Sequence, residues 1–135
     1  MSFAWEAYLI VAESLLEIRT PSLPTAAERE MIEEAHCRIA ISRAYYAAYC
    51  AARNYARDVE GLPLRGGGED HGAVIRHYAR GTRMHRAIAL ALRRLRDARN
   101  QADYDDHISQ DLRAMAESAI LDGREVLEAL DRLKR

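Results

Sequence analysis

The feature that most constrains the fold is a long stretch, residues 26–57, that contains neither glycine nor proline. Alanine is frequent there, and alanine has the highest intrinsic helix propensity. Thr25 followed by Glu28 has the spacing of a capping box, in which the threonine side chain accepts a hydrogen bond from the backbone three residues later. The sequence therefore predicts one long helix from Ala26 to Arg57, and the remaining chain must pack around it.

Strong helix breakers lie on both sides of this stretch. The segment 20–25 holds two prolines within four residues, which excludes a continuing helix. The segment 61–68 holds four glycines and one proline, and we expect it to be a flexible loop. Four further helices are predicted, at Phe3–Ile18, Asp70–Tyr78, Met84–Gln101 and His107–Leu133, and Asp105 or Asp106 is the expected cap of the last. No segment alternates like a strand, so we predict an all-α, up-and-down bundle of four to five helices in a single domain, residues 1–135.

Apolar residues at helical spacing indicate which face of each helix is buried. In the first helix the predicted buried residues are Ala4, Tyr8, Val11, Leu15 and Ile18. In the long helix one continuous stripe is formed by Ile32, Ala35, Ile39, Ser42, Tyr46 and Tyr49. In the fourth helix they are Ile88, Leu92 and Leu95. In the last helix they are Ile108, Leu112, Met115, Ala119, Val126 and Leu130.

Charge and composition exclude several classes of protein. The formal net charge is −1, which argues against a general nucleic-acid coat protein, although residues 76–99 are rich in arginine and hold a single aspartate, Asp97. No signal peptide or membrane span is visible, so we expect a cytoplasmic location. Cys37 and Cys50, thirteen residues apart on one helix, would lie about 20 Å from each other. They are therefore expected to be buried free thiols, not a disulfide.

The segment from Arg96 to Tyr104 gathers groups that bind anions. Positions 96, 99, 100 and 103 follow helical spacing, so Arg96, Arg99, Asn100 and Asp103 are expected on one helix face. Such a face is either a solvated stripe of salt bridges or a surface that binds phosphate, whose geometry suits arginine. We expect Asp103 to pair with Arg96 or Arg99. No histidine spacing suits a metal site, and no phosphate-binding loop is present, so no metal or cofactor is predicted.

A second polar segment lies on the long helix. Ser42, Tyr45, Tyr46 and Tyr49 share one side of it, either as core and interface packing or, together with Arg43, as the border of a site that includes Arg99. Whether Tyr45 or Tyr46 faces the core stays open. His71 follows the glycine-rich loop, where it is either a surface or capping residue or a ligand-binding group.

These segments together resemble the HEPN superfamily. The resemblance rests on residues 42–49 (Ser-Arg-Ala-Tyr-Tyr-Ala-Ala-Tyr), on Asp70-His71-Gly72, and on residues 99–104 (Arg-Asn-Gln-Ala-Asp-Tyr), and it covers about residues 3–132. It implies a helical bundle that usually dimerises. In the ribonuclease branch, an Arg-x4–6-His motif from each subunit forms a composite site that cleaves RNA without metal. Members are often encoded beside a minimal nucleotidyltransferase as toxin and antitoxin, whereas others bind nucleotides or lack activity.

The chain departs from that motif at the histidine. Tyr104 stands where histidine is expected, and His107 lies outside the usual window. Because tyrosine titrates near 10, it is a poorer base than histidine. The pair Arg80 and His85 fits the spacing but spans Gly81 in a turn, so we treat that match as coincidental.

Three interpretations follow. In the first, a weakly active or inactive HEPN protein binds RNA, a nucleotide or a nucleotidyltransferase partner. In the second, it is a metal-independent endoribonuclease toxin in which Tyr104 or His107 replaces the missing histidine. In the third, it is a helical homodimer scaffold whose tyrosine-rich helix is only a dimer surface. The catalytic candidates are Arg99, Asn100 and Tyr104, and the binding candidates are Arg43, Tyr46, Arg96, Asp103 and His71.

Overall fold

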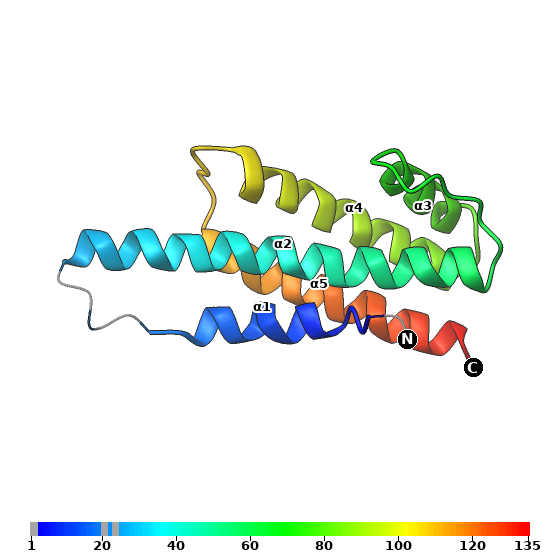
Figure 1. The fold of residues 1–135 in the computed structure, drawn as a ribbon, viewed down its shortest axis with the longest axis horizontal. Helices are drawn as coiled ribbons and strands as arrows, with labels where there is room; N and C mark the ends of the chain where they lie inside the picture. Colours follow the sequence, from blue (N-terminus) through cyan, green and yellow to red (C-terminus); the bar gives the residue numbers. More distant parts are fainter. Residues whose placement is uncertain (1–2, 20–21, 23–24) are drawn as a thin grey trace.

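A computed structural model describes residues 3–19, 22 and 25–135, and every regular element in those ranges is an α-helix. The helices are α1 (Ala7–Glu17), α2 (Ala26–Asp58), α3 (Asp70–Ala79), α4 (Arg83–Tyr104) and α5 (Leu112–Leu133). Four of them lie alongside one another and alternate in direction, while the short α3 lies at one end, within the connection from α2 to α4 (Figure 1). The predicted all-α, up-and-down bundle is therefore confirmed.

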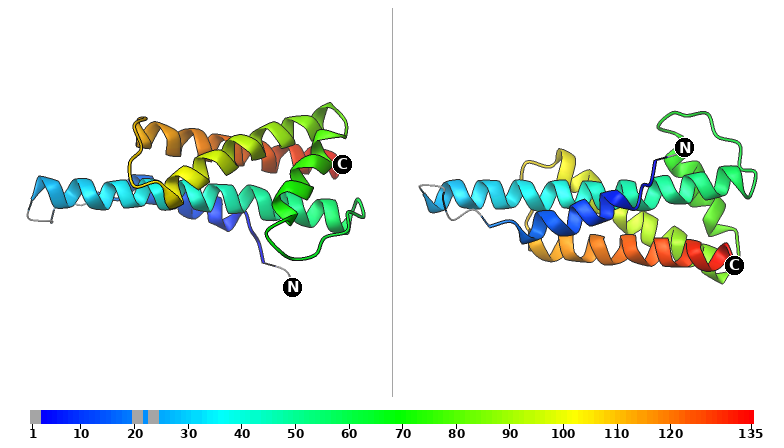
Figure 2. Two further views of the ribbon diagram at one scale, coloured as in Figure 1. Left: turned by 90° about the horizontal axis from the view of Figure 1, so that it is seen from above. Right: turned by 60° about the horizontal axis from the view of Figure 1, so that its bottom comes forward.

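Helix α2 is the centre of the bundle. The Thr25 side chain accepts a hydrogen bond of 3.1 Å from the backbone N–H of Glu28, as the capping box predicted. Helices α1, α4 and α5 all pack against α2, and the small side chains of its buried alanines allow this close approach. The fully buried alanines of α2 are Ala40, Ala44, Ala47, Ala48, Ala52 and Ala56. The first turns of α2 project beyond the ends of the other helices (Figure 2).

Gly123 allows α5 to approach α1 and α2 closely. A Cβ atom placed at Gly123 would lie 3.0 Å from Leu9 Cδ1 and 3.4 Å from the Ala44 carbonyl oxygen. Glycine within a helix costs about 1 kcal/mol relative to alanine. The tight contact between the three helices accounts for glycine at this position, because a larger side chain would push Leu9 away.

The predicted faces of α1 and α2 were partly wrong. In α1 the buried residues are Leu9, Ala12 and Leu16, whereas Val11 and Ile18 are exposed. Residues 8–12 are all apolar, so their pattern does not determine which side of the helix faces the core. In α2 the exposed residues include Ile32 and Ile39, which lie in the N-terminal half of the helix.

The buried faces predicted for α4 and α5 agree better with the structure than those predicted for α1 and α2. Ile88, Leu92 and Leu95 of α4 are buried, as expected, and in α5 the same holds for Ala119, Val126 and Leu130.

Several helix ends also differ from the prediction. Helix α1 begins at Ala7 instead of Phe3, because residues 4–9 form tighter turns whose backbone hydrogen bonds span three residues. Helix α5 begins at Leu112 instead of His107, and its cap is Asp111, whose carboxylate accepts a hydrogen bond of 3.1 Å from the Ala114 backbone. The aspartates at 105 and 106 therefore do not cap α5.

Both cysteines, Cys37 and Cys50, are buried and free, as predicted. No helix within the described ranges combines the length and the apolar character that a bilayer span requires.

A carboxylate with two histidines joins α2, α3 and α4 at one end of the bundle. Glu60 follows α2, and its two carboxylate oxygens lie 2.9 Å from His77 Nε2 and 2.7 Å from His85 Nε2. The Nδ1 atom of His85 in turn lies 2.7 Å from the Thr82 hydroxyl. Burial raises the pKa of Glu60, but hydrogen bonds from His77 and His85 outweigh it, and the net pKa lies below the ordinary value.

We predict that Glu60→Gln lowers the free energy of unfolding at pH 7 by about 1–2 kcal/mol, because a charged acceptor of two hydrogen bonds is lost. The depressed pKa means that this stabilisation is present above the unfolded-state value of about 4.3 and is lost as the pH falls through the lower folded-state value. Urea unfolding from pH 7 down to pH 2.5 measures both effects. Glu128→Gln, at an exposed position on α5, is the control. A constant difference between Glu60→Gln and wild type across this range would contradict the prediction.

Candidate functional site

Arg99 on α4 is the centre of a polar cluster between α4 and α2. Its Nη2 atom donates a hydrogen bond of 2.8 Å to the Tyr46 hydroxyl on α2, and its Nη1 atom donates one of 3.0 Å to Asn100 Oδ1. Its Nε atom lies 3.0 Å from Asp103 Oδ2, one helical turn along α4. The expected pairing of Asp103 with an arginine is therefore made, and the partner is Arg99.

The carboxylate of Asp103 connects Arg99 to the polar residues of α2. The buried Ser42 hydroxyl donates to Asp103 Oδ2 at 3.4 Å and accepts from Arg43 Nη2 at 3.1 Å. The Arg43 guanidinium carbon lies 5.2 Å from the centre of the Tyr46 ring, a cation–π arrangement. Two segments distant in sequence, 42–46 and 99–103, thus form one network.

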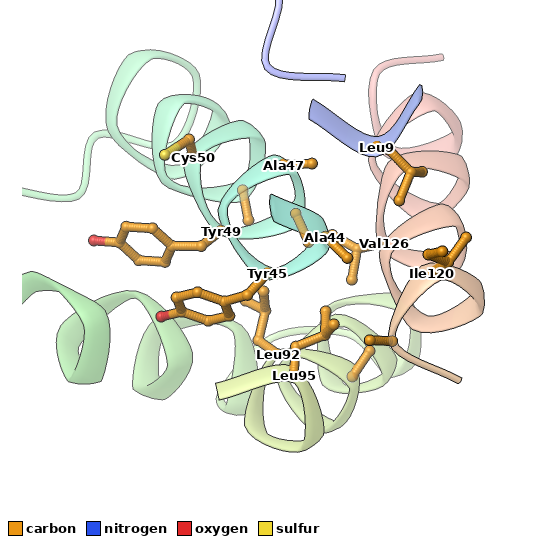
Figure 3. Close-up of a cluster of buried hydrophobic side chains, with 14 of the residues drawn as sticks. Leu9, Ala44, Tyr45, Ala47, Tyr49, Cys50, Leu92, Leu95, Ile120 and Val126 are labelled. Carbon is orange, nitrogen blue, oxygen red and sulfur yellow. The ribbon is translucent and has the colours of Figure 1, made fainter. Parts of the chain in front are cut away.

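Tyr45 and Tyr49 bring α3 into the same region. Both rings project from α2 in one direction, away from the side where Leu9 and Val126 pack (Figure 3). The His71 ring of α3 stacks on Tyr49 at a centroid distance of 4.0 Å, and its Nδ1 atom is hydrogen-bonded to the Tyr45 hydroxyl. The same ring lies edge-on to Tyr46 at 6.3 Å. Tyr46 is therefore a neighbour of both Arg99 and His71.

The environment determines the protonation of these groups. Burial raises the pKa of Tyr45 well above its ordinary value and that of Tyr49 to about 12, so both hydroxyls stay protonated at neutral pH. Burial, followed by the positive charges of Arg96 and Arg99, lowers the pKa of His71. The neutral His71 therefore accepts from the Tyr45 hydroxyl at Nδ1 and carries its own proton on Nε2.

Two further residues position the site: Arg38 was not singled out from the sequence, and Asp70 was named there only as part of the segment 70–72. Arg38 of α2 donates hydrogen bonds of 2.9 Å to the Ala102 carbonyl and 2.7 Å to the Asp105 carbonyl, which satisfies free carbonyls at the end of α4. Asp70 is buried beside His71, and its carboxylate accepts from the backbone N–H groups of Arg65 at 3.1 Å and Gly66 at 2.7 Å. Neither role leaves a local pattern, because both partners are backbone groups.

An open cavity of about 630 Å³ adjoins this cluster. Tyr46, Tyr49 and His71 line one side of it, and the glycine segment 66–68 lines another. Arg53 also lines the cavity, and its guanidinium carbon lies 5.9 Å from the centre of the Tyr49 ring. The glycine-rich loop is thus a wall of a cavity beside the polar cluster.

The structure brings only some of the other predicted residues close to Arg99. Tyr104 is 70% exposed, and the Arg99 guanidinium carbon lies 5.5 Å from its ring centre. The Arg96 side chain makes no hydrogen bond or ion pair with any described residue and lines a different hollow, on the α3 side. His107 is exposed in the segment between α4 and α5. His85 is bound to Glu60, which agrees with reading its spacing from Arg80 as coincidental.

The third interpretation, with the tyrosine-rich side of α2 as only a dimer surface, was wrong for two of its tyrosines. Tyr45 and Tyr49 are buried within the chain against α3 and α4, so they are not available to a second subunit. Tyr46 is half-buried at the edge of the cavity. The question of which tyrosine faces the core is thereby answered in favour of Tyr45.

The arrangement is chemically suited to an anion with an exchangeable proton. Arg43, Arg96 and Arg99 outnumber the carboxylates of Asp103 and Asp70 around the cluster, which leaves a local positive charge. Tyr46 and His71 add polar hydrogens at the edge of the cavity. Within the described ranges, no group of three or more His, Cys, Asp or Glu residues is placed to hold a metal ion.

Comparison with known families identifies one match. The model of a family described as the HEPN domain matches residues 25–133, which include α2 to α5 and every residue of the polar cluster. Searches of curated proteins and of solved structures find no match.

We predict that the His71 imidazole titrates below the ordinary histidine value of about 6.5 in an NMR titration of its Cε1 proton. Arg96→Gln should move the midpoint upward, because it removes a positive charge that disfavours the imidazolium. Arg94→Gln is the matched control, since Arg94 pairs with Asp122 of α5. A wild-type midpoint at or above the ordinary value would contradict the geometry described for Tyr45 and His71.

Proposed function

Because this chain belongs to the HEPN domain family, we propose that it binds the phosphate of an RNA or a nucleotide at the Arg99 site. We define this site as Arg99, Asp103, Ser42, Tyr46 and His71. The family match supports a nucleotide- or RNA-related function in general terms. The observation that carries the finer proposal is that Arg99 is hydrogen-bonded to Tyr46, which lines one cavity together with His71.

The contacts of Arg99 support phosphate binding. Tyr46, Asn100 and Asp103 hold its guanidinium in one orientation, so little side-chain entropy remains to be lost when an anion binds. One N–H on each terminal nitrogen is left over for a ligand, since a guanidinium has five N–H groups. Charge-assisted hydrogen bonds from arginine to phosphate are among the stronger polar contacts in proteins.

A second candidate function, metal-independent cleavage of RNA, is favoured by the position of His71. In such a reaction the 2′-hydroxyl oxygen attacks the phosphorus and the bond to the 5′ oxygen breaks, which yields a 2′,3′-cyclic phosphate and a 5′-hydroxyl end. One group removes the 2′ proton and another protonates the leaving oxygen. His71 has Nε2 free of other partners among the described residues, and Tyr45 orients its ring. We therefore assign one of the two proton transfers to His71 rather than to Tyr104 or His107.

Partners follow from the family resemblance and from the exposed surface. A homodimer is supported by an exposed apolar surface next to the site: Tyr104 is 70% exposed, Ile39 is 48% exposed and Ile32 is 39% exposed. The motif segments 42–49 and 99–104 support a toxin role with a minimal nucleotidyltransferase as antitoxin. In a dimer through this surface, the Arg99 sites of the two copies would lie near the shared interface.

We predict that Arg99→Ala weakens binding of a 2′-O-methylated oligouridylate by roughly tenfold or more, which corresponds to the loss of a charge-assisted contact. The 2′-O-methyl groups prevent cleavage, so fluorescence anisotropy reports binding alone. Arg113→Ala is the matched control, because Arg113 is an exposed arginine that pairs with Glu117 on α5. Equal affinity of wild type and Arg99→Ala would overturn the proposed site.

The same proteins distinguish binding from catalysis when they are incubated with unmodified total RNA and tRNA in excess chelator. Cleavage by wild type, abolished in Arg99→Ala and in His71→Gln, would establish the second candidate. Binding without cleavage would leave the protein as an RNA- or nucleotide-binding module. The 2′,3′-cyclic phosphate ends are the chemical signature to look for.

We predict that the protein sediments as a dimer at micromolar concentration and that Ile39→Arg shifts it to monomer, because a charge would be buried in an apolar interface. Leu121→Arg is the control, since Leu121 is a similarly exposed apolar residue on α5. Analytical ultracentrifugation gives the masses. A wild-type monomer, or an equal effect of both substitutions, would argue against this surface.

A further inference from the structure

Three arginines from two helices converge on a hollow that the Arg99 site does not include. The hollow has a volume of about 340 Å³ and lies between α3 and α4. Arg76 comes from α3, whereas Arg93 and Arg96 come from α4, and among the described residues that line the hollow the one carboxylate is Asp97. None of the three side chains makes a hydrogen bond or ion pair with another described residue. Their charges are therefore left for a ligand.

Other arginines of the molecule, in contrast, are paired with carboxylates. Arg94, next to Arg93 in sequence, pairs with Asp122 of α5 at 3.0 Å. Arg113 and Arg124 pair with Glu117 and Glu13. Carboxylates are thus placed against arginines on the α5 side of the molecule, whereas the hollow between α3 and α4 has an excess of positive charge.

Gly72 shapes the floor of the hollow. A Cβ atom placed at Gly72 would lie 3.0 Å from Arg76 Nη1. The guanidinium of Arg76 therefore lies back across α3, over the glycine, toward the side where Arg93 and Arg96 lie. A side chain at residue 72 would contact this guanidinium and displace it from its present position.

The spacing along α4 links this hollow to the Arg99 site. Arg93, Arg96 and Arg99 are three residues apart, so each step advances about 4.5 Å along the helix and turns by about 60° around it. Arg99 faces α2 and Tyr46, while Arg93 lies beside Arg76 of α3. Arg96 lies between them, close enough to His71 for its charge to lower the pKa of that imidazole. The positive groups thus form a curved path around α4.

We propose that Arg76 and Arg93, linked through Arg96, form a second phosphate subsite, so that the ligand of the Arg99 site is a single-stranded polynucleotide and not a mononucleotide. This inference rests on the proposed function and names its class of ligand. A polynucleotide carries the repeated phosphates that a row of guanidinium groups fits. A duplex, whose persistence length is about 150 base pairs, is too stiff to follow a path that turns within one helix diameter.

The test compares two 2′-O-methylated probes, a dinucleotide with one internal phosphate and a twelve-residue oligouridylate, over a range of salt concentrations. For single strands, the logarithm of the binding constant falls with log salt by about 0.7 per neutralised phosphate. The double variant Arg76→Gln/Arg93→Gln removes one phosphate subsite, so it should flatten the slope for the oligouridylate by about 0.7 and weaken its binding roughly tenfold at 0.1 M salt. Dinucleotide binding, which depends on Arg99, should be unchanged.

The matched control is Arg113→Gln/Arg124→Gln, which removes the same charge from paired arginines on α5. Its slope should equal that of wild type. An unchanged slope in the Arg76/Arg93 variant, or the same flattening in both double variants, would overturn the second subsite. Circular dichroism confirms that each variant is folded before binding is measured.

Further measurements distinguish a failure of the second phosphate subsite from a failure of the Arg99 site. If Arg99→Ala leaves dinucleotide binding intact while the Arg76/Arg93 variant still flattens the oligouridylate slope, the Arg99 site is wrong and the polynucleotide subsite stands. If wild type binds neither probe, both ideas fail. If a polyglutamate peptide displaces the oligouridylate as well as unlabelled oligouridylate does, the surface recognises acidic chains in general and the polynucleotide subsite is overturned.

Discussion

The packing of α4 against α2 is the constraint on which the rest of the structure depends. Arg38 of α2 satisfies carbonyl groups at the end of α4, and Tyr46 of α2 accepts a hydrogen bond from Arg99 of α4. Both contacts require the two helices to be held at one register, which the small alanines of α2 and the buried Leu92 and Leu95 of α4 secure. The polar cluster is therefore a consequence of core packing and not of a separate loop.

The electrostatics of the cluster explain why an arginine can be held there in the absence of ligand. The Arg99 side chain is mostly covered, and an unpaired guanidinium in such a place would be costly. Asp103 offsets that cost, and Ser42 in turn donates to Asp103. Arg96 has no such partner in the described part of the chain and stays half-exposed. One arginine of the motif is thus fixed in position by the protein, while the other keeps its charge available.

The sequence was sufficient to predict the helices, because helix propensity, capping and helical spacing are local properties. The grouping of segments 42–49 and 99–104 was one of two alternatives, and the resemblance to the HEPN superfamily pointed to it. Which side of a helix is buried was harder to predict. Residues 8–12 are apolar on every side, and α2 is enclosed by three neighbours, so neither pattern has a distinct polar face. The contact of His71 with Tyr45 could not be inferred, since it depends on how α3 returns across α2. Arg38 was missed because a bond to backbone carbonyls has no sequence signature.

The short helix α3 shows how distant contacts bear on the site. A helix of ten residues is too short to be stable alone, so its position must come from tertiary contacts. Near its beginning, Asp70 holds the backbone of Arg65 and Gly66; near its end, His77 is bound to Glu60. His71 lies between these two attachments, one residue after Asp70. The placement of the imidazole beside Tyr46 therefore depends on Glu60 as well as on Asp70, although Glu60 touches no residue of the Arg99 site. Loss of either the Asp70 or the Glu60 contact would move His71 and leave Arg99 in place. The phosphate-binding group of the proposed site is therefore held independently of the group proposed to transfer a proton.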